Sequence, residues 1–88
     1  MYKVILLPPA EKFYRKLCHT NREILRRIDA ALESLKMDPL QGKPLRDQLK
    51  GKFLLRVGVY RIIYSVHKKE ITVYILDIGH RKEIYRNK

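Results

Sequence analysis

The clearest hydrophobic pattern runs from Lys52 to Tyr64 (KFLLRVGVYRIIY), where two stretches of β-forming residues flank Gly58-Val59. A two-residue connection between such stretches predicts a β-hairpin. Because successive side chains of a strand point to opposite faces, one face of this hairpin is apolar, and we expect it to belong to the core. The apolar face carries Phe53, Leu55, Val57, Tyr60, Ile62 and Tyr64.

The opposite face of the predicted hairpin is basic. The pairing puts Arg56 opposite Arg61, with Lys52 farther along the same face. Like charges placed directly opposite each other destabilise a sheet. We therefore expect this face to bind an anion. The same pairing puts Val57 opposite Tyr60, Leu55 opposite Ile62 and Phe53 opposite Tyr64, and leaves Leu54, Ile63 and Ser65 on the basic face.

The first third of the chain predicts a strand and a helical hairpin. An apolar run from Tyr2 to Leu7 predicts a buried strand, and helical spacing predicts a short helix over Pro9–Cys18, because proline is tolerated in a first helical turn. Thr20 and Glu23 match the capping box, which predicts a second helix from about Asn21 to Lys36. The apolar stripe of this helix consists of Ile24, Leu25, Ile28, Ala31, Leu32 and Leu35.

The remaining pattern completes one α+β domain over residues 1–88. The proline- and glycine-containing segment 37–51 predicts a loop, pinned to the core by Leu40, Leu45 and Leu49. A polar turn at 67–70 precedes Ile71–Ile78, whose β-branched residues predict a central strand that Gly79 ends. The order is therefore β-α-α-β-β-β. We expect a mainly antiparallel sheet with the helical hairpin packed on one face.

Charge is the most informative feature of the composition. The chain has 20 Lys and Arg against 9 Asp and Glu, which gives a net charge of +11 over 88 residues. Such a charge favours an anionic partner such as nucleic acid, an acidic protein or a membrane surface, although it also simply aids solubility. No apolar run is long enough for a transmembrane helix. A single cysteine, Cys18, fits a reducing cytosol, so we expect a cytoplasmic protein that does not bind membranes.

Several kinds of site are excluded by the residues present. There is no glycine-rich phosphate loop and no Cys/His cluster with zinc spacing, so we expect no metal and no cofactor. Cys18 is expected at a core or boundary position and not as a nucleophile. If the last strand pairs with the segment 60–66, Gly79-His80-Arg81 lies near Tyr60-Arg61. Residues distant in sequence then converge at one end of the sheet: Lys52, Arg56, Arg61, His80, Arg81 and Tyr85.

Two blocks of sequence resemble the RelE/ParE toxin superfamily. They are the stretch 44–64, with LKGKFLLRVGVYRIIY at its end, and the closing IGHRKEIY at 78–85. The resemblance implies a bacterial or archaeal type II toxin that is neutralised by a cognate acidic, RelB-like antitoxin. RelE-like members enter the ribosomal A site and cleave the bound messenger RNA. ParE-like members share the fold, lack the nuclease residues and inhibit DNA gyrase.

The resemblance also assigns roles to residues of this chain. RelE-type cleavage needs no metal: the ribose 2′-OH attacks the adjacent phosphate, and the site handles protons and stabilises the phosphorane. Arg61 and Arg81 match phosphate-binding positions, and Lys52 matches a basic residue whose pKa crowding by the arginines would lower. Tyr85 matches a tyrosine that stacks on a base or contacts the 2′-OH, and His80 is a candidate for proton transfer. The RNA-binding candidates are Lys50, Arg56, Tyr60 and Lys82.

One position departs from the nuclease pattern and keeps three functions open. Some ribonuclease members carry a second lysine where this chain has Leu54. Arg61, Arg81 and Tyr85 favour an endoribonuclease that acts on messenger RNA in the ribosome. Leu54 favours a gyrase inhibitor of ParE type. A basic RNA-binding domain without toxicity is the third possibility.

Overall fold

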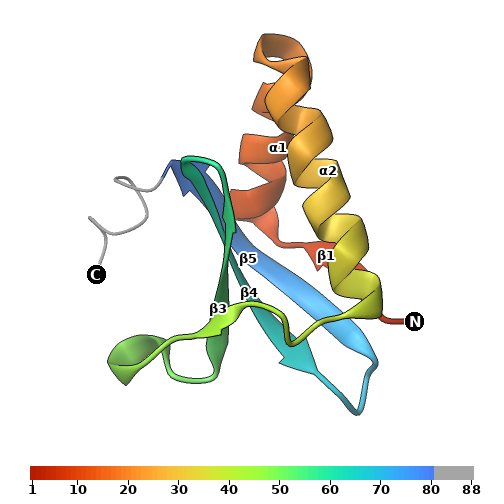
Figure 1. Ribbon diagram of the computed structural model, residues 1–88, viewed down its shortest axis with the longest axis vertical. Helices are drawn as coiled ribbons and strands as arrows, with labels where there is room; N and C mark the ends of the chain where they lie inside the picture. Colours follow the sequence, from red (N-terminus) through yellow and green to blue (C-terminus); the bar gives the residue numbers. More distant parts are fainter. Residues whose placement is uncertain (81–88) are drawn as a thin grey trace.

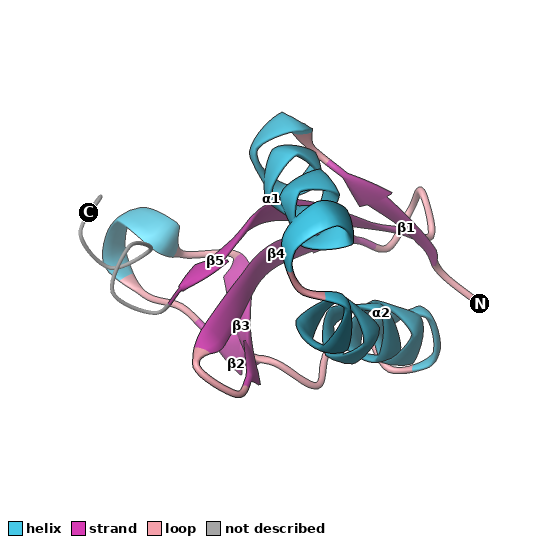
Figure 2. Cartoon of the chain, turned by 90° about the horizontal axis from the view of Figure 1, so that it is seen from above, coloured by secondary structure: helices cyan, strands magenta, loops and turns pink. Residues whose placement is uncertain are grey.

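A helical hairpin covers one face of a five-stranded sheet (Figure 1). The computed structural model describes residues 1–80 of the chain. The strands lie in the order β1-β5-β4-β3-β2, and both helices lie on the same side of them (Figure 2). The elements are β1 (Lys3–Leu6), α1 (Pro8–Thr20), α2 (Arg22–Met37), β2 (Lys43–Pro44), the 3₁₀ helix η1 (Asp47–Leu49), β3 (Lys52–Val57), β4 (Tyr60–His67) and β5 (Thr72–His80).

The predicted α+β architecture and the hairpin register are confirmed. Strands β3 and β4 pair antiparallel, with Val57 opposite Tyr60 and Arg56 opposite Arg61. Strand β5 pairs antiparallel with β4 and parallel with β1, so the sheet is mixed. The apolar face of the hairpin packs under the helices. Its residues Ile62 and Tyr64 are fully buried in a core that also contains Ala10, Leu17, Ile28, Leu32, Leu35, Val73, Ile75 and Ile78.

The junction between the helices differs from the sequence prediction at its cap. Helix α1 continues through Thr20, whose hydroxyl donates to the carbonyl of Lys16, so this residue is helical and does not cap α2. Asn21 is extended instead, with a φ of −155°, and its Oδ1 accepts a hydrogen bond from the amide of Ile24. The predicted capping box is therefore wrong by one residue, while the predicted α2 helix and its apolar stripe are confirmed.

Strand β1 is less buried than its apolar sequence predicts. It lies at an edge of the sheet, paired only with β5, and Lys3 and Ile5 are exposed. Strand β5 is central, as predicted, but it extends through Gly79 to His80 and contains a register shift opposite Ile63 and Tyr64. The ladder therefore reaches two residues farther than expected, and it positions the candidate site described below.

The segment between α2 and β3 is more ordered than a plain loop. It contains β2, whose Lys43 and Pro44 pair with β3, and η1. The amide of Gly42 donates a 2.8 Å hydrogen bond to the hydroxyl of the buried Tyr64, which ties this segment to the core. Leu45 and Leu49 are partly buried, but Leu40 is 49% exposed, so its predicted pinning role is wrong.

Two further expectations from the sequence concern the burial of Cys18 and the presence of a membrane-spanning helix. Cys18 is exposed on α1, so its predicted core or boundary position is wrong. In residues 1–80, no helix combines the length and the hydrophobicity needed to cross a membrane. The predictions made for Arg81, Lys82 and Tyr85 fall on residues outside the described part of the chain.

Candidate functional site

Arg56 and Arg61 lie side by side on the face of the sheet opposite the helices, and we call this the arginine face. They are direct cross-strand partners on β3 and β4. Arg56 is exposed, whereas Arg61 is only 3% exposed. Because side chains alternate along both strands, the arginine face also carries Lys52, Leu54, Ile63 and Ser65.

The guanidinium of Arg61 forms few hydrogen bonds within the described part of the chain, and Asp77, the β5 partner of Ile63, is the carboxylate on the same face. One terminal nitrogen, Nη1, donates to the carbonyl of Tyr60 at 3.3 Å, and Nε has no hydrogen-bond partner within residues 1–80. None of the ion pairs formed within those residues involves Arg61. A buried charged group whose hydrogen-bond donors are not all satisfied is costly. The arrangement is suited to receive an anion at Arg61.

The centre of the arginine face is apolar. Leu54 and Ile63 are cross-strand partners and are 6% and 7% exposed. Lys52, the partner of Ser65, lies four residues from Arg56 on β3, which corresponds to about 13 Å along a strand. This separation is too large for the crowding of Lys52 by the arginines that the sequence suggested, so that expectation is wrong. Lys50 is exposed beside the start of the same strand.

The β4–β5 ladder brings the end of β5 to the start of β4, as predicted. Tyr60 pairs with His80, and Arg61 pairs with Gly79. Tyr60 points toward the helices, because its ring lies 5.8 Å from the ring of Phe13 on α1. The ring of His80 packs edge-on against Tyr60 on that same side. The sheet therefore separates His80 from Arg61, and the expected single cluster of Lys52, Arg61 and His80 is wrong.

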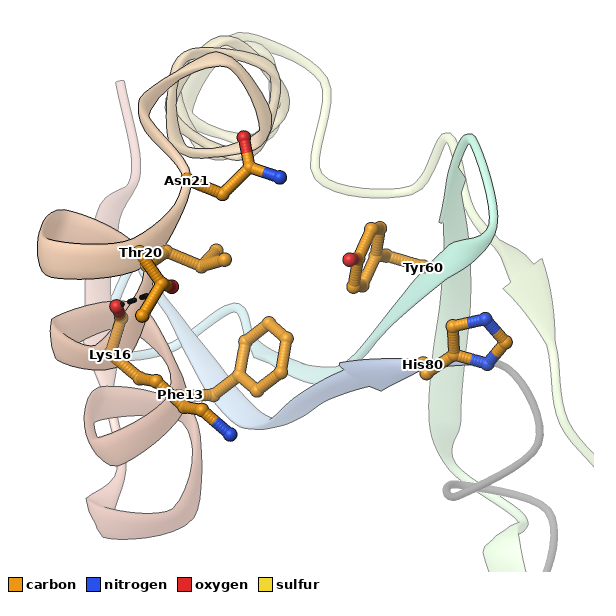
Figure 3. A pocket seen from close by; sticks show the side chains of 7 residues that line it. Phe13, Lys16, Thr20, Asn21, Tyr60 and His80 are labelled. Atoms are coloured by element: carbon orange, nitrogen blue, oxygen red, sulfur yellow. Dashed lines mark hydrogen bonds between the residues drawn. The ribbon is translucent and has the colours of Figure 1, made fainter.

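A pocket lies where this end of the sheet meets the junction of the two helices (Figure 3). Its volume is about 340 Å³. Sequence reasoning selected Tyr60 and His80 but missed the helical side of the pocket, because the facing of α1 toward the end of β5 depends on tertiary packing. The lining residues are Phe13, Lys16, Leu17, Thr20, Asn21, Tyr60 and His80.

Other titratable groups are engaged away from this end of the sheet. Tyr74 lies on the arginine face as the partner of Ser65, and its hydroxyl donates to Glu70 at 2.7 Å, which raises the pKa of Tyr74. The ring of Tyr74 also packs edge-on against His67. Residues 1–80 contain no cluster of three or more His, Cys, Asp or Glu side chains with the proximity that metal binding needs.

Comparison with known proteins places this geometry in a family. The sequence model of the family described as "ParE toxin of type II toxin-antitoxin system, parDE" matches residues 4–85. The chain belongs to the RelE/ParE toxin superfamily. This toxin is 43% identical over 60 residues to Toxin RelG from Mycobacterium tuberculosis, and the match covers 67% of this chain and 69% of RelG.

Solved structures of the superfamily share the fold of this toxin. The toxin-antitoxin complex RelBE2 from M. tuberculosis contains a chain with a TM-score of 0.80 and 35% identity, covering 91% of this toxin and 98% of that chain. The isolated Escherichia coli RelE toxin has a TM-score of 0.76 at 18% identity, covering 99% of this toxin and 94% of RelE. The likeness to E. coli RelE shows the fold alone. The family match and the RelBE2 likeness agree with the motif resemblance, and the chain is a type II toxin of this superfamily.

Proposed function

We propose that this toxin is a ribosome-dependent endoribonuclease that cleaves messenger RNA in the ribosomal A site. The observation that supports the proposal most is the burial of Arg61, a 3%-exposed residue beside Arg56 that forms no ion pair within residues 1–80. A fixed, partly desolvated cation stabilises charge that develops in a transition state better than a mobile, hydrated one. Arginine also matches the geometry of phosphate oxygens and stays charged at every physiological pH.

The proposed reaction uses the RNA itself as nucleophile. The ribose 2′-oxygen forms a bond to the adjacent phosphorus and loses its proton to the site. The bond between phosphorus and the 5′-oxygen then breaks, and that oxygen takes up a proton, which leaves a 2′,3′-cyclic phosphate and a 5′-hydroxyl. Arg61, together with Arg81, is assigned to the phosphorane, whose extra negative charge appears only during the reaction. Tyr85 is assigned to the base or the 2′-OH.

The remaining candidates take positions along the RNA. Lys52 is about 13 Å from Arg56 along β3, which suits a neighbouring phosphate better than the scissile one, so we assign it to positioning of the backbone. His80 stays a candidate for proton transfer to or from an RNA strand that passes the end of the sheet. Contacts with other parts of the RNA are assigned to Lys50, Arg56, Tyr60 and Lys82.

We assign a RelB-like acidic antitoxin as the partner that neutralises this toxin in the cytoplasm. Two kinds of observation support this part of the proposal. The structure of RelBE2 is that of a toxin-antitoxin complex, and the structure from Pyrococcus horikoshii is that of an archaeal RelE-RelB complex. The net charge of +11 favours an acidic protein that covers the basic surface.

Primer extension tests the proposed nuclease activity. After induction of the toxin, translated messages should show new 5′ ends in phase with codons, and purified ribosomes should support the same cuts. Inhibition of supercoiling by purified gyrase tests the alternative, which the apolar Leu54 favours. Growth arrest with inhibited supercoiling and unchanged messages would replace the nuclease with a gyrase inhibitor.

A further inference from the structure

The pocket at the end of the sheet has aromatic walls on two elements. Tyr60 and His80 form the wall on the sheet, and Phe13 faces them from α1 (Figure 3). The ring of Tyr60 contacts both of the others, with ring centroids 5.8 Å apart in each case. Flat π-surfaces of this kind favour planar ligands, and unstacked nucleobases bind to protein aromatic rings in this way.

Two side chains of the pocket, Asn21 and Lys16, offer hydrogen-bond donors. The Oδ1 of Asn21 is occupied by the amide of Ile24, so the side-chain amide is oriented and its Nδ2 is directed toward Tyr60 (Figure 3). Lys16 adds an ammonium group, which forms no ion pair within residues 1–80. Among residues 1–80, no carboxylate lines the pocket. Such a pocket selects a ligand with acceptor groups on its edge.

We propose that this pocket binds one unstacked nucleobase of the RNA and reads whether its edge carries an oxygen or an amino group. The inference rests on the proposed function, because the RNA is the substrate assigned there. Guanine and uracil present an exocyclic oxygen, whereas adenine and cytosine present an exocyclic amino group at the equivalent position. The donors of Asn21 and Lys16 favour the first pair, so these two side chains contribute to base preference and not to the chemical step.

The position of the pocket fits a base next to the phosphate on Arg61. Tyr60 and His80 form the last rung of the β4–β5 ladder, and Arg61 is in the adjacent rung on the opposite face. Adjacent residues of a strand are separated by about 3.3 Å. An RNA strand that passes over the end of the sheet therefore reaches both faces, with its backbone at Arg61 and a base turned toward α1.

Replacing Asn21 by Asp isolates the donor without removing the helix cap. Asp and Asn are equally good N-caps, so the Oδ1 bond to Ile24 is kept, while the two amide donors are replaced by an acceptor. The probes are fluorescent 2′-O-methyl hexamers of uridine and of cytidine, which cannot be cleaved by 2′-OH attack and differ at the base edge. We expect the parent toxin to bind the uridine hexamer about fivefold more tightly, and Asn21→Asp to reverse or abolish that preference.

Two matched variants control for charge and for folding. Gln41→Glu makes the same change of charge beyond the opposite end of α2 and should keep the preference for uridine. Lys16→Gln should weaken binding of the uridine hexamer, whereas Lys12→Gln, on α1 outside the pocket, should change it less. Thermal unfolding of Asn21→Asp, Lys16→Gln and Lys12→Gln should resemble that of the parent, because each position is exposed. Gln41→Glu also removes the bonds from its amide to Ser34 and to the carbonyl of Asp38, so it should unfold at a slightly lower temperature.

The outcomes separate this inference from the nuclease assignment. If the parent cuts messages on ribosomes but shows no preference between the hexamers, or if Asn21→Asp keeps that preference, the base pocket is wrong and the nuclease stands. If the variants lose affinity for the antitoxin while RNA binding is unchanged, the pocket is a protein-docking site and the inference is overturned. If ribosomes show no cleavage at all and neither hexamer binds, both proposals fail.

Discussion

The ring of His80 packs edge-on against the ring of Tyr60, its cross-strand partner, with centroids 5.8 Å apart. This contact assigns His80 to the helix side of the sheet, away from Arg61, which follows Tyr60 directly in β4. The sequence predicts that His80 and Arg61 belong to one cluster, but they lie on opposite faces of the sheet. The arginine face carries the proposed phosphate site, and the other side carries the pocket.

Replacing Arg61 by Met tests the proposed role of its charge. Met keeps an unbranched stem in the buried position but removes the positive charge. We therefore expect cleavage on ribosomes to fall by at least about 100-fold. The free energy of unfolding should stay the same or increase, because a buried charge with an unpartnered Nε is removed. Arg56→Met, at the exposed partner position, should have a smaller effect on cleavage. Full activity of Arg61→Met would remove this residue from the site.

The hydrogen bond between the helices predicts a dependence of stability on pH. The hydroxyl of Tyr14 on α1 donates to Asp29 on α2, and this bond, with burial, raises the pKa of Tyr14 from 10.0 to about 12. A group whose pKa is raised on folding stabilises fully below its unfolded pKa and loses that contribution as pH rises toward its folded pKa. Stability of the parent should therefore fall between pH 10 and pH 12.

The variant Tyr14→Phe tests whether the hydroxyl of Tyr14 causes the predicted fall in stability at high pH. It should lower the free energy of unfolding at neutral pH by about 1 kcal/mol and make the decline above pH 10 shallower. Tyr2→Phe serves as the control for loss of a tyrosine hydroxyl. Urea titrations at closely spaced pH values measure both effects, and identical profiles for the parent and Tyr14→Phe would contradict the assigned bond.

Gly42 lies so close to Tyr64 that a side chain at this position would force neighbouring atoms to move. A Cβ at this position would lie 2.5 Å from the Tyr64 hydroxyl and 2.9 Å from the carbonyl oxygen of Leu54. Gly42→Ala should destabilise the fold by about 1–3 kcal/mol, measured by urea unfolding. Combining it with Tyr64→Phe, which removes the hydroxyl, should cost less than the sum of the two single changes. Strict additivity would show that the two positions do not interact.

The apolar stripe of α2 predicts that a charged residue in place of Leu32 strongly destabilises the fold. This side chain is 7% exposed in the core beneath α2, and Leu32→Asp would bury a carboxylate without a partner. We expect a loss of at least about 3 kcal/mol, enough to leave much of such a small domain unfolded. Ala30→Asp, at an exposed position of the same helix, is the control. Cooperative unfolding of Leu32→Asp at the parent's temperature would show that the stripe is assigned to the wrong face.

Local patterns predicted those features that depend on a short span of chain. The register of the β3–β4 hairpin followed from the two-residue turn and from alternation alone, and it was correct at each pair tested. The α2 stripe followed from helical period. The N-cap was missed because the extent of α1, which decides whether Thr20 or Asn21 is free to cap, is not a property of the capping motif itself.

The sequence by itself determined the family, the order of the main elements and the presence of two facing arginines, because these depend on motifs and on neighbours along the chain. Only the tertiary structure decided that Arg61 is buried, that Leu54 and Ile63 form an apolar centre between the cations, and that His80 faces α1. These features depend on which strand pairs with which and on how the helices cover the sheet. Contacts between residues far apart in sequence set both, and no local pattern encodes them.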